Sequence, residues 1–231
     1  MQDTLATLFD GNDAHVDHLP DGYFDDVQDG QRPPVVSVCC SDSRVSQEGM
    51  WSVEEPGWLF TPSNIGNRAW DDAGGERVVD GNLLYPVAHT GTRTVAVVGH
   101  TGCGAVTAAY EAQTGDGLDD YPGIEREVRS LLPVVEDAID EGVVDPSNDD
   151  ETVVNRLVEY NVDRQVAFLR DAEEIPDETS VYGFVYDFQR VYGDAAGRAY
   201  LVNLDGETDV DAIAAAVDET YRAHVRRLRE A

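Results

Sequence analysis

The sequence contains no lysine, and this absence shapes its electrostatic character. Its 16 basic residues are all arginine and stand against 46 aspartates and glutamates, which gives a formal net charge of −30 at pH 7. A field of this sign repels nucleic acid and anionic membranes, so we expect neither as a partner. The missing lysine also excludes a Walker-type phosphate-binding loop, in which a lysine reaches the phosphates.

The acidic residues are spread along the chain and do not form a tail, as the stretches "WDDAGGE" and "RDAEEIPDET" illustrate. We interpret them as the solvated surface of a halophilic protein in preference to an acidic binding face. At molar salt the Debye length is only about 3 Å, so the self-repulsion of such a surface is screened. The sequence therefore predicts a stability that depends on salt.

Long apolar runs are also missing. No run of about eighteen apolar residues occurs, so no transmembrane helix is predicted. The first residues, "MQDTLATLFDGNDAH", have neither the basic start nor the apolar core of an export signal. We therefore expect a cytoplasmic protein. In that reducing compartment, its 3 cysteines are more typical of a metal site or of catalysis than of disulfides.

The apolar pattern predicts an α/β fold with a central, mostly parallel β-sheet flanked by helices. Two short and continuously apolar segments, residues 35–39 and 94–99, are typical of strands buried on both faces. We treat residues 1–231 as one domain, with an α/β core at 33–205 and a C-terminal helix at 206–231. An edge strand is expected at 58–62, further strands at 180–188 and 197–204, and helices at 76–89, 103–112, 153–169 and 210–228.

Polar turns follow the two apolar strands, at the carboxyl ends where open α/β sheets carry their chemistry. One turn, "GHTGCGA", contains His100 and Cys103, and the other begins at Cys40. Two thiolates and one imidazole form a soft ligand set that suits zinc and leaves a tetrahedral position open. The alternative is that these cysteines are small buried hydrophobic residues and that His100 closes its turn. We favour that alternative for Cys39, which should face away from Cys40 because side chains alternate along a strand.

Asp42 and Arg44 come directly after the Cys40 position. A carboxylate this close to a ligand could itself close the open metal position. The guanidinium of Arg44 offers bidentate hydrogen bonds that would hold Asp42 away from the metal, free to accept the proton of a zinc-bound hydroxide. The alternative is a local surface ion pair, which contributes little.

Four motifs resemble the β-class carbonic anhydrases in order and separation: "CSDSRV" at 40–45, "EPGWLF" at 55–60, "GNR" at 66–68 and "VVGHTGCGAV" at 97–106. The later "NVDRQVAFL" and "VYGFVYDFQRVYG" also fit, so the resemblance extends over most of the chain. It implies reversible hydration of carbon dioxide to bicarbonate and a proton by a zinc-bound hydroxide. It also implies one Zn²⁺ per chain. The implied ligands are Cys40, His100 and Cys103, with Asp42 and Arg44 as the catalytic pair. The acidic, lysine-free composition suggests a haloarchaeal member.

The resemblance also implies an assembly. Residues 1–32 are expected to form a helical arm that embraces a partner subunit, in a homodimer or a dimer of dimers. Leu5, Leu8 and Phe9 would lie on one face of that arm.

Two positions depart from the family's pattern. An arginine usually precedes the loop asparagine, and a tryptophan stands three residues before the first ligand in members regulated by bicarbonate. Here Ser63 and Ser37 occupy these positions. We therefore expect a constitutively open site, in which Asp42 stays with Arg44.

Two other functions remain open from the sequence. Relatives of this family use the same zinc constellation to hydrolyse carbon disulfide or carbonyl sulfide, and nothing around the ligands separates these substrates from carbon dioxide. A non-catalytic, zinc-stabilised anion-binding protein is the third candidate. A structural zinc, however, does not need Asp42 and Arg44.

Overall fold

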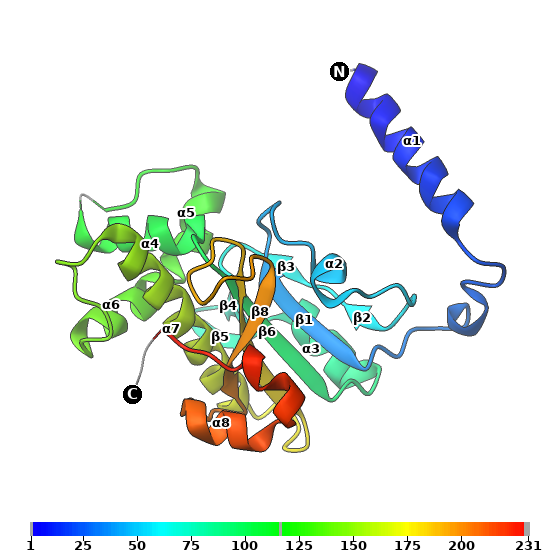
Figure 1. Cartoon of the computed structure of the whole chain (residues 1–231). Helices are drawn as coiled ribbons and strands as arrows, with labels where there is room; N and C mark the ends of the chain where they lie inside the picture. Colours follow the sequence, from blue (N-terminus) through cyan, green and yellow to red (C-terminus); the bar gives the residue numbers. More distant parts are fainter. Residues whose placement is uncertain (1, 116, 229–231) are drawn as a thin grey trace.

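A central β-sheet organises the chain in the computed structural model, which describes residues 2–115 and 117–228 (Figure 1). Its strands are β1 (Val35–Cys40), β2 (Leu59–Phe60), β3 (Ser63–Asn64), β6 (Thr94–His100), β7 (Ser180–Asp187) and β8 (Arg198–Leu204). The order is β2-β1-β6-β7-β8, and β3 also pairs with β1. The β7–β8 pair is antiparallel and the other pairs of this sheet are parallel. The predicted α/β fold is therefore confirmed.

The two apolar strands lie side by side at the centre of this sheet, as β1 and β6. Both are buried along almost their whole length, because apolar side chains pack on both faces of the sheet at this point. Each strand extends one residue beyond its predicted end and finishes on a candidate ligand, Cys40 in β1 and His100 in β6. Parallel pairing therefore brings both ligands to the same edge of the sheet.

The helix predicted at 76–89 is wrong in its first four residues. There β5 (Glu76–Val79) pairs with β4 (Trp70–Ala73) in an antiparallel hairpin. The turn between them contains Gly74 and Gly75, both with positive φ, which is the geometry of a tight hairpin turn. Helix α3 (Gly81–His89) begins only after Asp80, whose carboxylate caps it.

The predicted C-terminal helix is also wrong as a continuous element. Helix α8 (Val210–Ala216) ends where Val217 adopts an extended conformation. A 3₁₀ helix, η2 (Glu219–His224), then starts at Asp218, whose carboxylate accepts the Thr220 N–H at 2.9 Å. Asp218 thus acts as a second N-cap within the apolar stripe, and the predicted helix is divided into two short elements, α8 and η2. The last predicted residues, 229–231, lie outside the described part.

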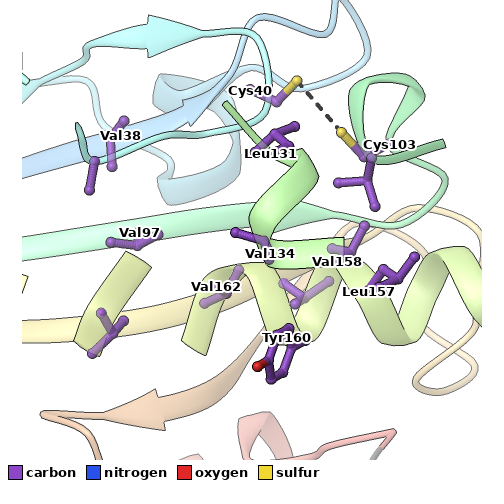
Figure 2. Packing of buried hydrophobic residues seen from close by; sticks show 14 of the residues in the cluster. Val38, Cys40, Val97, Cys103, Leu131, Val134, Leu157, Val158, Tyr160 and Val162 are labelled. Atoms are coloured by element: carbon purple, nitrogen blue, oxygen red, sulfur yellow. Dashed lines mark hydrogen bonds between the residues drawn. The ribbon is translucent and has the colours of Figure 1, made fainter. Parts of the chain in front are cut away.

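The longest helix, α7 (Asp150–Asp171), lies across β6 and β7, and its buried stripe confirms the helix predicted at 153–169. Two glycines allow this close approach. A Cβ atom on Gly99 of β6 or on Gly183 of β7 would lie 2.8 or 2.6 Å from methyl groups of Val162. Figure 2 shows Val162 and its neighbours in this core. The other helices are α2 (Gln47–Trp51), α4 (Gly104–Thr114), α5 (Pro122–Arg129) and α6 (Leu132–Asp140).

The N-terminal segment stands apart from this core. Helix α1 (Gln2–His18) extends away from the sheet and is followed by a short 3₁₀ turn, η1 (Asp25–Val27) (Figure 1). The exposed fractions of Leu5, Leu8 and Phe9 are 52%, 66% and 62%. Among the described helices, none has the length and apolar character needed to cross a membrane.

Candidate metal centre

Three metal-ligating side chains meet at the carboxyl edge of the sheet. Cys40 ends β1, His100 ends the neighbouring β6, and Cys103 immediately precedes α4. Their ligand atoms all lie within 4.8 Å of one another, and the three residues are buried. Figure 2 shows Cys40 and Cys103 pointing toward each other. The structure thus brings together the three residues that the sequence singled out.

The orientation of His100 leaves one ring nitrogen available. Its Nδ1 lies 3.0 Å from the carbonyl oxygen of Thr101. A carbonyl oxygen only accepts hydrogen bonds, so Nδ1 carries the proton and Nε2 keeps its lone pair. Nε2 is buried and has no hydrogen-bond partner among the described residues. Since a buried polar atom is costly to leave unpaired, this nitrogen fits a metal ligand.

The two sulfur atoms are also spaced for an ion. Cys40 Sγ and Cys103 Sγ are 3.9 Å apart, whereas two sulfurs bonded to one tetrahedral zinc at about 2.3 Å lie about 3.8 Å apart. The Cys103 thiol donates to the Cys40 sulfur, which lowers the pKa of Cys40 and raises that of Cys103. A thiolate at Cys40 is the form that binds metal. The residues present therefore fit zinc.

Cys39 has a different environment from its neighbour. It packs with Ala96 and Val98 on the other face of the sheet, whereas Cys40 belongs to the main core. Burial raises the pKa of the Cys39 thiol to about 12. The prediction that Cys39 faces away from the ligands is confirmed.

The turn between His100 and Cys103 is held by a residue that sequence reasoning missed. Gly102 has a φ of +62°, and its N–H donates to Asn155 Oδ1 at 2.9 Å. Asn155 is buried on α7. The signal available in the sequence was a polar amide within the apolar stripe of that helix. A buried amide needs a hydrogen-bond partner, so its position indicates a contact with another segment.

Asp42 and Arg44 form a complete bidentate pair. Asp42 Oδ1 accepts the backbone N–H and the Nε–H of Arg44, both at 2.9 Å, and Oδ2 accepts from Nη2 at 2.7 Å. These hydrogen bonds hold the pKa of Asp42 well below its usual range, so the carboxylate stays ionised. Oδ2 also lies 3.8 Å from His100 Nε2. The carboxylate therefore lies beside the ligand group and forms an ion pair with the Arg44 guanidinium.

Comparisons of sequence place this site in a known group of proteins. A family model described as "Carbonic anhydrase" matches residues 35–192. The chain is 29% identical over 171 residues to a carbonic anhydrase of Pseudomonas aeruginosa, covering 72% of this chain and 74% of that protein. It is 30% identical over 166 residues to one of Emericella nidulans, covering 70% of this chain and 67% of that protein. The residues matched by the family model include both polar turns of the site.

Comparisons of structure agree on the fold. A tetrameric β-carbonic anhydrase of Sordaria macrospora has a TM-score of 0.70 at 22% identity, covering 87% of this chain and 97% of its own. A Coccomyxa β-carbonic anhydrase, solved with acetazolamide, has a TM-score of 0.70 at 21% identity and covers 95% of this chain and 96% of its own. These similarities extend over most of the α/β architecture described above.

Proposed function

Because the chain belongs to the β-class carbonic anhydrase family, we propose that it catalyses the reversible hydration of carbon dioxide to bicarbonate and a proton at a zinc ion. The observation that carries this proposal is the ligand group itself. Three soft ligand atoms lie within 4.8 Å of one another, and the imidazole nitrogen among them is buried and unpaired in the described structure. Three protein ligands leave a tetrahedral position for substrate chemistry.

In this proposal, Cys40, His100 and Cys103 hold the zinc. When bound, zinc supplies a Lewis acid at which water ionises near neutral pH. The Thr101 carbonyl fixes the His100 tautomer, so that Nε2 keeps a lone pair with which it would hold the metal. Burial of all three ligands excludes competing water from their side of the site.

Asp42 supplies the hydrogen-bond acceptor for the nucleophilic water. Its Oδ2 lies beside the ligand group, and the low pKa of the carboxyl keeps it ionised, so that it accepts a hydrogen bond. Arg44 prevents this carboxylate from becoming a fourth ligand, because its guanidinium occupies both oxygens. Ser37 and Ser63 stand where regulated relatives carry tryptophan and arginine, which supports a site that is open without a bicarbonate-driven switch.

The function is tested by assaying carbon dioxide hydration and carbon disulfide hydrolysis on the same zinc-loaded sample. Hydration followed by stopped flow, without hydrogen sulfide release from carbon disulfide, supports the proposal. Hydrogen sulfide release without hydration would replace it with the carbon disulfide reaction. A protein that holds zinc and turns over neither substrate would be the non-catalytic anion-binding protein.

We further propose that the chain works as a homodimer or a dimer of dimers, with α1 embracing a partner subunit. Leu5, Leu8 and Phe9 are largely exposed, so α1 has an apolar face that its own chain does not cover. The Leu8→Asp variant is expected to shift the molar mass in light scattering toward the monomer. The control, Ala14→Asp, adds the same charge on the opposite face of α1 and should leave the mass unchanged. Equal masses for both variants would contradict this role of α1.

The composition supports a salt-adapted, cytoplasmic protein of haloarchaeal type, with a net charge of −30 and three cysteines that are free in the structure. Screening of this charge in molar KCl is expected to raise the midpoint of thermal unfolding by about 5–10 °C, which corresponds to roughly 2–3 kcal/mol for a domain of this size. Sucrose serves as the uncharged control, since it favours compact states without screening charge. A midpoint that is the same in dilute buffer and in molar KCl would contradict this proposal.

A further inference from the structure

The ring of Phe188 contacts both Arg44 and His100. The Cζ atom of Arg44 is 4.6 Å from the centroid of the Phe188 ring. The same ring stacks on the imidazole of His100, with centroids 5.8 Å apart and an interplanar angle of 25°. One aromatic side chain therefore contacts both the guanidinium that holds Asp42 and a candidate metal ligand.

The loop that carries Phe188 is anchored in the protein interior. Asp187, the last residue of β7, is fully buried. Its carboxylate accepts three backbone N–H groups of the following loop and the hydroxyl of Thr101, the residue next to His100. The loop donors are Gln189 at 3.1 Å, Val191 at 3.1 Å and Tyr192 at 2.8 Å, and Thr101 Oγ1 lies at 3.4 Å. This network fixes the backbone of Phe188 relative to the ligand turn.

Arg44 needs such a support, because it is the most exposed part of the site. Its side chain is 51% exposed, compared with 17% for Asp42. Apart from Asp42, the guanidinium donates to the carbonyl oxygen of Gly102 at 3.3 Å. A long and exposed arginine side chain loses rotamer entropy when it is held in one geometry. The face of Phe188 offsets part of this cost through a cation–π contact.

We propose that Phe188 is a positioning residue, which holds the Arg44 guanidinium in its bidentate grip on Asp42. This inference rests on the proposed function for its catalytic consequence, whereas the arrangement of Arg44 can be measured without turnover. The ring acts through Arg44 and does not touch the reacting atoms. A side chain that fills the same space without an aromatic face cannot replace it.

The test compares Phe188→Leu with Phe188→Tyr, which keeps the ring. Phe184→Leu is the matched control, because Phe184 lies on β7, the strand that leads into the Phe188 loop, and packs edge to face on Trp51, with centroids 5.0 Å apart. The first readout is the Nε–H resonance of Arg44 in a ¹H–¹⁵N spectrum, identified by its loss in Arg44→Lys. This proton lies near the aromatic face and is hydrogen-bonded to Asp42 Oδ1.

In the Phe188→Leu variant, we expect the Arg44 resonance to lose its ring-current shift and to exchange faster with solvent. We also expect kcat/KM for carbon dioxide hydration to fall about three- to tenfold. Phe188→Tyr and Phe184→Leu should resemble the unmodified protein in both measurements. An Arg44 resonance in Phe188→Leu with unchanged solvent exchange would overturn the inference, and so would a loss of kcat/KM of equal size in Phe184→Leu. If the unmodified protein hydrates no carbon dioxide, the proposed function fails, while the exchange measurement still decides the role of Phe188.

Discussion

Replacing Cys40 with alanine is expected to reduce the zinc content from about one per chain to nearly none. Removal of one of the three proposed ligands leaves only Cys103 and His100 of the group whose ligand atoms lie within 4.8 Å of one another. Because the metal contributes several kcal/mol of transition-state stabilisation, kcat/KM should fall by at least about a thousandfold. Zinc content is measured by mass spectrometry of dialysed protein, and activity by stopped flow.

The adjacent cysteine provides a matched control for this variant. Cys39→Ala removes the same sulfur atom one residue earlier on the same strand, but from the layer formed with Ala96 and Val98. It should keep its zinc and its activity, at a modest cost in stability from the lost packing. Zinc lost equally from Cys39→Ala and Cys40→Ala, or retained by both, would contradict the assigned ligand set.

Replacing Asp42 with alanine is expected to separate metal binding from catalysis. The three ligands are unchanged, so zinc content should stay at about one per chain. Activity should nevertheless fall by about 10²–10³ in kcat/KM, which is typical for the loss of a preorganised hydrogen-bonding group. The low pKa of Asp42 makes this group an acceptor at neutral pH in the unmodified protein.

The control for this variant is an ion pair elsewhere on the surface. Arg93 Nε and Glu178 Oε1 are 3.2 Å apart, and both side chains are exposed. Such a pair contributes little, so Glu178→Ala should leave kcat/KM unchanged. Full activity in Asp42→Ala would contradict a catalytic role of the Asp42–Arg44 pair. It would instead support the alternative reached from the sequence, a local surface ion pair.

The ligand group could be predicted from the sequence because local patterns determine it. Two continuously apolar strands predicted a parallel sheet, and the carboxyl ends of neighbouring parallel strands meet at one edge. Cys40 and His100 end those two strands. Once the strands are predicted to be neighbours, the two residues are predicted to lie close together. The contact between Asp42 and Arg44 is local too, since only one residue separates them in the chain.

The supporting residues could not be predicted because their partners are distant in sequence. Asn155 contacts Gly102 across 53 positions, and Phe188 reaches Arg44 from the end of another strand. No periodicity marks either contact. The wrong helical segments have local causes instead: Gly74 and Gly75 favour a hairpin before α3, and the Asp218 cap interrupts the C-terminal stripe.

The central claim is that a zinc ion held by Cys40, His100 and Cys103 hydrates carbon dioxide. The most direct measurement is stopped-flow hydration in molar KCl between about pH 6 and pH 9, with zinc content determined on the same sample. We predict about one zinc per chain and an activity that rises with pH, because two thiolates donate more charge to the metal than imidazoles would. A fully zinc-loaded protein that hydrates no carbon dioxide at any of these pH values would contradict the claim.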